Sequence, residues 1–170
     1  MKKLIFFVGL FLTLAASSGY AQKCALIDME YILKRIPSYE SANKQIEDAS
    51  KQWQSEVDTK TKEAEAMYKK YQAELPTLTG ANKTKRENEI VAKENEIKAL
   101  NNKYFGQDGE LFKRRDALIK PIQDDIYNAV KEVSVAEGYK IVVDRASASS
   151  VIFASPDIDI SDEILAKLGY

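Results

Sequence analysis

Residues 38–75 read SYESANKQIEDASKQWQSEVDTKTKEAEAMYKKYQAEL and open the stretch 38–135 that decides the fold. Apolar side chains recur here every eleven residues, which is three helical turns and keeps them on one side of a nearly straight helix. The remaining positions are mostly charged or polar, as on a solvated helix face. A helix of this length spans roughly 55 Å, more than the diameter of a small globular domain, so we expect an arm that projects. Its apolar seam consists of Ala42, Ile46, Ala49, Trp53, Val57, Ala64, Tyr68, Tyr71 and Leu75.

A turn follows this first limb, and a second helix returns. Pro76, Thr77, Thr79, Gly80 and Asn82 cluster as turn residues do, which predicts a tip near 75–82. The returning segment keeps a seven-residue repeat, or 3.5 residues per turn, which is typical of coiled-coil packing. The sequence therefore predicts an antiparallel helical hairpin over 38–118. The return seam consists of Ile90, Ile97, Leu100, Tyr104, Leu111 and Leu118.

Three positions interrupt the returning helix or end it. Gly106 and Gly109 each cost roughly 1 kcal/mol relative to Ala inside a helix, and they are either a soft point of the arm or simply tolerated. Pro121 is expected to kink the helix where it leaves the arm. Gly138 is expected to end the helix in a left-handed conformation.

The segments before the arm predict one part of a small β-rich body. Residues 23–28 form a short apolar run consistent with a strand. Residues 29–36 suit two helical turns, which Pro37 ends because the residue before a proline disfavours the α region. Ser38 is then expected to cap the long helix.

The segments after the arm predict the rest of this body, which comprises 22–37 and 119–170. Residues 139–144 and 151–154 are expected to pair as a hairpin across a turn of small residues. A terminal helix over 162–168 follows, capped by Asp159 or Ser161. We therefore predict an α+β fold, mostly helical, with a long hairpin arm projecting from a small β body.

The first 21 residues predict an export signal. Lys2 and Lys3 precede an apolar run over 4–16, and small residues up to Ala21 suit a cleavage site. The run is short for a membrane span, which needs about 20 apolar residues, so an anchor is the weaker alternative. A lipoprotein is disfavoured because Lys23 precedes Cys24, where lipid attachment needs a small residue. The sequence thus predicts a soluble mature chain in the periplasm.

The composition argues against an enzyme. The chain has no histidine and one cysteine, which excludes Cys–His and Ser–His nucleophile systems and makes most zinc sites implausible. It also lacks a Gly-rich phosphate loop. An acidic cluster lacks the glycine and distal glutamate of a calcium loop, so its members are expected to cap helices. We predict no catalytic residue, metal or cofactor; the cluster is Asp157, Asp159, Asp162 and Glu163.

Charge and the single cysteine give weaker indications. Removing Lys2 and Lys3 lowers the formal net charge from −1 to −3, so no basic excess points to nucleic acid. Cys24 is expected to be a small buried hydrophobe, with a redox or intermolecular role as the alternative. The tip is the cationic end and carries Lys83, Lys85 and Arg86. These residues suit a weak contact with anionic lipid or lipopolysaccharide, or simply a solvated helix face.

A second apolar stripe lies beside the seam of the hairpin. A two-helix hairpin buries one stripe, so an adjacent one must meet a neighbouring arm, the body or another polypeptide. We predict that this stripe contributes to the binding of a client protein. Its residues are Met67, Val91, Phe105, Phe112 and Ile119.

The order and spacing of several segments resemble the Skp/OmpH family of periplasmic chaperones, which hold unfolded outer-membrane proteins without ATP. The resemblance covers essentially the whole mature chain. The matching segments are CALIDM at 24–29, IPSY at 36–39, IKPIQ at 119–123, GYKIVVD at 138–144 and ASPDIDIS at 154–161.

The resemblance implies a homotrimer whose short strands join into a central β-barrel, with three helical hairpins around a cavity. Such pairing would also cover strand edges that one subunit leaves unprotected. Well-known members are strongly basic, whereas this chain is slightly acidic, so apolar contacts should matter more here. The strands expected to oligomerise carry Ala25, Leu26, Ile27, Ile141, Val142, Val143, Val151, Ile152 and Phe153.

Two functions follow from these observations. The first is an ATP-independent holdase that binds unfolded outer-membrane proteins between its arms and prevents their aggregation. The second is a structural coiled-coil spacer or adaptor of the cell envelope with no client. Exposure of the apolar stripe on the inner face of the arm distinguishes the two.

Overall fold

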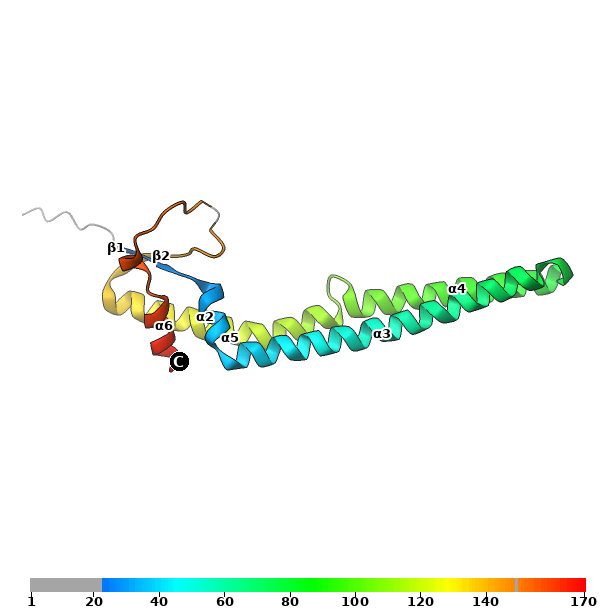
Figure 1. Ribbon diagram of the computed structural model, residues 1–170, viewed down its shortest axis with the longest axis horizontal. Coiled ribbons are helices and arrows are strands. Elements are labelled where there is room, and N and C mark those ends of the chain that lie inside the picture. Colours follow the sequence, from blue (N-terminus) through cyan, green and yellow to red (C-terminus); the bar gives the residue numbers. More distant parts are fainter. Residues whose placement is uncertain (1–22, 149) are drawn as a thin grey trace, which may run out of the picture.

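The computed structural model describes residues 23–148 and 150–170, so the predicted signal peptide lies outside the described residues. A long arm and a small body lie at opposite ends of the molecule (Figure 1). Helix α3 (Pro37–Glu74) forms the outgoing limb and η1 (Leu75–Thr77) lies at the tip. Helices α4 (Gly80–Phe105) and α5 (Glu110–Glu137) return along α3. The predicted helical hairpin is confirmed.

The outgoing helix begins one residue earlier than expected, at Pro37. Ile36 is its N-cap residue, with an extended backbone (φ −93°, ψ 110°) and no side-chain cap. The prediction that Ser38 caps this helix is therefore wrong. Proline suits the first helical position because its missing N–H has no intrahelical partner there and its φ angle is already helical.

The returning limb is two helices, because the chain leaves the helix between Phe105 and Glu110. A Cβ atom on Gly106 would collide with the backbone carbonyl oxygen of Asn102, and one on Gly109 would lie 2.8 Å from the carbonyl oxygen of Tyr104. Both glycines are thus required by close backbone approach. The expectation of one continuous return helix is wrong at this point. Helix α5 contains Pro121, where a kink stays a prediction, and it ends at Gly138 (φ 78°) as expected.

Burial along the seam decreases from the body towards the tip. Ala42, Ile46, Ala49 and Val57 of α3 are buried, as is Tyr104 on the returning limb. Further out, Tyr68 and Leu75 are 50% and 41% exposed. Ile90 is an exception, since it is buried near the tip, beside Met67 and Tyr71. The body end of the hairpin is therefore packed like a core, and the distal half is held by fewer apolar contacts.

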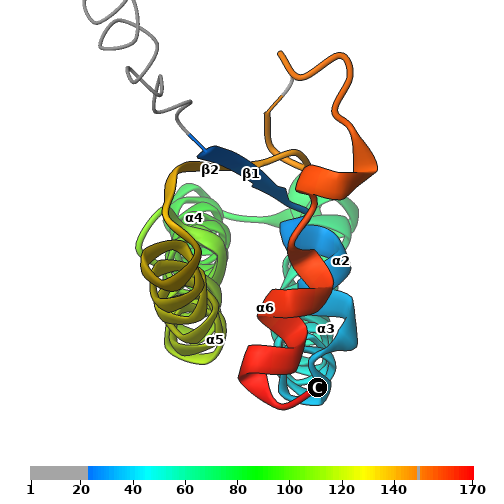
Figure 2. The same cartoon turned by 90° about the vertical axis from the view of Figure 1, so that its left-hand side faces the viewer.

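The body contains a two-stranded parallel sheet of β1 (Lys23–Ile27) and β2 (Tyr139–Asp144), in register from Cys24 opposite Ile141 to Ile27 opposite Asp144. The other edge of β1 is partly covered, because Ile160 N donates to Leu26 O at 2.9 Å. Helices α2 (Met29–Arg35) and α6 (Ser161–Leu168) lie beneath the sheet, next to the two limbs in the view along the arm (Figure 2). Turn η2 (Pro156–Ile158) leads into α6.

One apolar core ties the sheet and helices of the body to the root of the arm. Ile32 of α2, Ile126 of α5 and Ile164 of α6 are fully buried at its centre. Burying such a side chain contributes about 1.5–3 kcal/mol, so these three positions are a main source of the body's stability. Within residues 23–148 and 150–170, no helix is long and apolar enough to cross a membrane.

Three predictions for the body are wrong. Helix α6 begins at Ser161 and its N-cap residue is Ile160, without a side-chain cap, rather than Asp159 or Ser161. Residues 151–154 form no strand, and Ile152 and Phe153 are 100% and 84% exposed. The strand after α5 pairs with β1, more than 100 residues away, instead of with its neighbour. Cys24 is exposed rather than buried: the first two residues of β1 are exposed, and burial begins at Ala25.

Candidate binding surfaces

A hollow of about 440 Å³, the root hollow, lies where the arm meets the body. Phe112 is 54% exposed at this hollow, and Tyr39 is half-buried. Ile119 is only 9% exposed and packs against Ala42 and Ile46 of the seam. The root hollow is lined by Tyr39, Phe112, Arg115, Asp116, Ile119, Lys120, Gln123 and Asp124.

The charges around the root hollow balance. The positive charges of Arg115 and Lys120 are matched in number by the negative charges of Asp116 and Asp124. Lys120 Nζ lies 2.8 Å from Asp124 Oδ2, and this hydrogen bond raises the pKa of the lysine. Because these charges cancel, the hollow combines the apolar surface of Phe112, Tyr39 and Ile119 with a polar rim that does not select a strongly charged ligand.

A larger hollow of about 620 Å³, the mid-arm hollow, lies between α3 and α4. Tyr68 is 50% exposed there, and Ala64 and Ile97 are half-buried. An exposed aromatic ring beside small and aliphatic side chains is suited to contact with apolar groups of a partner. The mid-arm hollow is lined by Thr61, Ala64, Glu65, Tyr68, Lys69, Gln72, Glu94 and Ile97.

The structure divides the predicted second stripe. Phe112 and Ile119 come together in the root hollow, although Ile119 belongs mainly to the hairpin core. Val91 is 52% exposed, and Phe105 packs edge to face on Tyr104 with ring centroids 6.3 Å apart. Met67 lines a separate small crevice near the tip. The expectation of one continuous exposed stripe therefore does not hold.

Tyr39 and Tyr68 line the two hollows but were not among the predicted binding residues. Tyr68 fits the eleven-residue repeat, and this assigned it to the buried seam. The decline of burial towards the tip leaves it half exposed. The tyrosines of α3 could have indicated this surface from the sequence, because the amphipathic ring of a tyrosine can pack in a seam and also contact a ligand.

An aromatic joint fastens the two limbs at mid-length. The rings of Trp53 and Tyr104 stack with centroids 5.0 Å apart and planes 7° apart. Tyr104 Oη donates to Glu56 Oε2 at 2.8 Å, and this bond raises the pKa of the tyrosine. The Arg114 guanidinium lies 5.8 Å from the Trp53 ring. The joint lies directly before the break at Gly106, so it holds the last turn of α4 on α3.

Ion pairs cross between the limbs beyond this joint. Lys93 Nζ lies 2.7 Å from Glu63 and 3.0 Å from Glu96, and Lys60 Nζ lies 3.3 Å from Glu96. Hydrogen bonds to Glu63 and Glu96 raise the pKa of Lys93, and the same lysine lowers the pKa of Glu63. Such partly exposed pairs contribute little individually, but as a network they orient α4 on α3.

The tip retains two of its three predicted cations as exposed groups. Lys83 and Lys85 are exposed, whereas Arg86 is half-buried and pairs with Glu74 and Glu89 at 3.7 and 3.0 Å. Arg86 therefore helps to hold the limbs together. An anion at the tip would meet the two lysines first.

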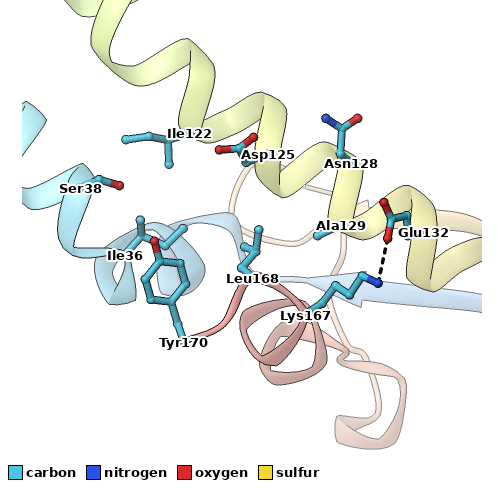
Figure 3. Close-up of a pocket in the computed structure, with 10 residues that line it drawn as sticks. All are labelled: Ile36, Ser38, Ile122, Asp125, Asn128, Ala129, Glu132, Lys167, Leu168 and Tyr170. Carbon is cyan, nitrogen blue, oxygen red and sulfur yellow. Dashed lines mark ion pairs between the residues drawn. The ribbon is translucent and has the colours of Figure 1, made fainter.

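The body carries a cleft of about 310 Å³ between α5 and the end of α6 (Figure 3). Its lower wall is apolar, with Ile36 and Leu168, and Lys167 Nζ reaches Glu132 Oε2 at 2.8 Å across it. This ion pair lowers the pKa of Glu132. The pair fastens α6 to α5 and so helps to position the arm on the body.

The residues predicted to oligomerise fall into a buried and an exposed group. Ala25, Leu26 and Ile27 are buried within the chain itself. The exposed group lies on β2 and in the following loop. Ile141 is 50% exposed, and the other exposed members are Val151, Ile152 and Phe153, while Val142 and Val143 are half-buried.

The acidic residues near α6 serve local structure. Asp159 Oδ1 accepts from Ser161 N at 2.9 Å, and Arg145 pairs with Asp28 and Asp159 at 3.1 and 3.3 Å. The pKa of Asp28 is lowered, chiefly because its carboxylate accepts from the N–H of Tyr31. In the described part of the chain, no group of three or more Cys, Asp or Glu side chains is arranged to hold a metal ion.

Comparisons with known proteins agree with this architecture. Residues 23–168 match the family described as "Outer membrane protein (OmpH-like)". The chain belongs to the OmpH-like family. The proteins named "Chaperone protein Skp" from Yersinia enterocolitica and Escherichia coli K12 are 30% and 28% identical to this OmpH-like chain, over 99% of both partners in each case.

A solved structure shows the same fold. A crystal structure of a putative outer membrane chaperone (OmpH-like) from Caulobacter crescentus superimposes with a TM-score of 0.65 and 14% identity. The match covers 89% of this OmpH-like chain and 86% of the other. The predicted resemblance to the Skp/OmpH family is thereby confirmed. The relatives described above are named as chaperones and not as enzymes.

Proposed function

We propose that this chain is an ATP-independent holdase chaperone of the periplasm that binds unfolded outer-membrane proteins and keeps them from aggregating. Membership of the OmpH-like family and the name of its Skp relatives support a chaperone of outer-membrane proteins. The observation that carries the proposal is the pair of partly apolar hollows on the arm, with Phe112 and Tyr68 each about half exposed. Many weak apolar contacts of this kind would retain an unfolded chain and release it without fuel.

The active form in this proposal is a homotrimer around a shared β-barrel. Two features of the single chain support it. The outer edge of β2 pairs with no other strand among the described residues, and unpaired edges invite a partner chain. The neighbouring loop exposes Ile152 fully and Phe153 to 84%, which is unfavourable unless another subunit covers them. Light scattering of the mature chain should give three times the monomer mass.

The holding activity is tested by diluting a urea-unfolded β-barrel membrane protein into buffer with and without the mature chain. We expect stoichiometric amounts of chaperone to suppress the rise in turbidity in the absence of nucleotide. An unchanged turbidity curve with an intact trimer would favour the spacer or adaptor function instead. Aggregation that is suppressed only when ATP is added would contradict a holdase.

The contribution of the predicted stripe is tested with the double variant Phe105→Ser, Phe112→Ser. Loss of client retention with an unchanged trimer is expected, because Phe112 is 54% exposed and lies outside the body core. Met67, Val91 and Ile119 complete the proposed client-binding set. Since Ile119 is buried in the seam, its substitution should lower stability as well.

The tip provides a weaker contact in this proposal. Lys83 and Lys85, with Arg86 behind them, would attract anionic lipid or lipopolysaccharide when the chaperone approaches a membrane. Co-sedimentation with anionic vesicles should weaken at 0.5 M salt and with Lys83→Gln, Lys85→Gln. Equal sedimentation with neutral vesicles would contradict this part of the proposal.

A further inference from the structure

Tyr39 lines the root hollow and Tyr68 lines the mid-arm hollow, so the positions of these two residues on α3 give the separation of the hollows. Both residues lie on α3, which is continuous from Pro37 to Glu74, and they are 29 residues apart. At 3.6 residues per turn this separation is about eight full turns, so both side chains project from the same face of α3. At 1.5 Å per residue their Cα atoms lie about 44 Å apart along the arm. The two hollows thus lie on the same side of α3, where one ligand that runs along the flank of the seam can reach both.

Polar side chains of α3 lie between the hollows, along the flank of the buried seam. Asn43, Ser50 and Gln54 project from α3 within about 60° of the direction of Tyr39, as their spacing along the helix requires. Ile46 and Val57 also share that direction and are buried in the seam, so the polar side chains lie along its flank. Asn43 and Ser50 are half-buried, and the Gln54 amide donates to Asp58 at 2.8 Å. The arm therefore presents a partly apolar hollow at the root, a row of polar side chains that can hydrogen-bond to a backbone, and a more apolar hollow at mid-arm.

We propose that one arm binds an extended polypeptide at two points, with one apolar patch in each hollow and at least about 13 residues between them. The length follows from the 44 Å separation and the rise of about 3.3 Å per residue in an extended chain. This inference rests on the proposed holdase function and specifies the segment that each arm holds.

The features of the two hollows favour an unfolded, weakly charged chain over other ligands. The charges of the root hollow cancel, and the mid-arm hollow has one lysine against two glutamates, so neither attracts a polyanion. Volumes of about 440 and 620 Å³ each accommodate one or two large apolar side chains. In membrane β-barrel proteins one strand of about 10 residues and its turn repeat along the sequence at a spacing similar to these roughly 13 residues. The two hollows would therefore bind apolar patches from two successive strands of the unfolded protein.

The test uses the intact mature chain and synthetic peptides with two Trp-Leu-Trp patches joined by a proline-rich spacer. Such spacers are semi-rigid at about 3.1 Å per residue, so about 14 residues bridge the hollows and 7 do not. Fluorescence anisotropy should show the 14-residue spacer binding about tenfold tighter or more than the 7-residue spacer or a single patch. Equal affinities for the two spacers would overturn the inference.

Variants distinguish a peptide bound along one arm from a peptide that bridges two arms. Tyr68→Ser and Phe112→Ser should each remove the advantage of the long spacer, while Tyr127→Ser, an aromatic residue 67% exposed on the body side of α5, should keep it. An advantage that survives Tyr68→Ser would mean that the peptide bridges two arms, and the inference would fail. It would also fail if Tyr68→Ser lowered the oligomeric mass, because a second copy would then cover the hollow.

The aggregation assay on the same preparation separates this inference from the proposed function. Suppressed aggregation without any dependence on spacer length would contradict the two-point reading and leave the holdase in place. A chain that neither suppresses aggregation nor distinguishes the spacers would contradict both.

Discussion

Replacing Trp53 with alanine tests whether the aromatic joint holds the distal arm. The Trp53 ring is half-buried, stacks on Tyr104 at 5.0 Å and lies beneath Arg114. Truncating a fully buried aromatic ring costs 3–5 kcal/mol, and a stacked aromatic pair adds about 0.5–1.5 kcal/mol to area burial. Because Trp53 is only partly buried, we expect Trp53→Ala to lower the free energy of opening of the distal arm by about 2 kcal/mol.

Hydrogen exchange with mass spectrometry measures this opening segment by segment. A loss of about 2 kcal/mol corresponds to roughly 30-fold faster exchange, and we expect it in α4, which the joint holds on α3. Peptides from β1, α2 and α6 should keep their protection, since the body core does not include Trp53. The control is Gln52→Ala, an exposed neighbour on α3 that should change stability by less than about 0.5 kcal/mol.

Two results would refute the reasoning. If α4 exchanged less than threefold faster in Trp53→Ala, the joint would not hold the arm and the inter-limb ion pairs would do so. If the body accelerated as much as α4, the arm and body would open as one cooperative unit. Tyr104→Phe refines the test, because it keeps the stacked ring and removes only the hydrogen bond to Glu56.

Three further predictions concern stability and titration. Ile126→Ala, at a fully buried position, should lower the free energy of unfolding in urea by about 3 kcal/mol. Gly138→Ala places a Cβ atom at φ 78° and should cost about 1 kcal/mol in thermal unfolding, whereas Gly80→Ala, with open space around it, should not. Tyr71 should titrate at a pKa of about 12 because it donates to Glu87, and Glu87→Gln should return this pKa towards 10 in absorbance titrations. Since the folded-state pKa is raised, this bond stabilises the arm fully below about pH 10 and is lost as the pH rises through 12.

The long hairpin could be predicted because its signal is repeated along the chain. Eleven-residue and seven-residue spacings place residues such as Ile46 and Ile90 on one face whatever their neighbours are, and both are buried. Pro37 and Gly138 also marked the ends of helices correctly. Helix ends of this kind can be predicted from the neighbouring residues alone, without knowing which distant segments are in contact.

The wrong predictions concern positions where the structure depends on contacts between residues that the sequence pattern does not bring together. Nothing in the sequence shows that a Cβ atom at Gly106 would collide with Asn102, so a required break was not distinguished from a tolerated glycine. Residues 151–154 have strand-like composition, but β2 instead pairs with β1 from the other end of the chain. Ile119 fits the second stripe by spacing, yet the packing of α5 on α3 buries it. The candidate surface was therefore only partly predictable.

The most direct test of a client-holding arm is site-specific photocrosslinking. A photoreactive amino acid at position 68 or 112 should crosslink to an unfolded β-barrel membrane protein bound by the mature chain, because both side chains are about half exposed on the arm. The same group at position 127, which is more exposed but lies on the body side of α5, should crosslink weakly. Equal crosslinking at all three positions, or none on the arm while aggregation is suppressed, would contradict a client-holding arm.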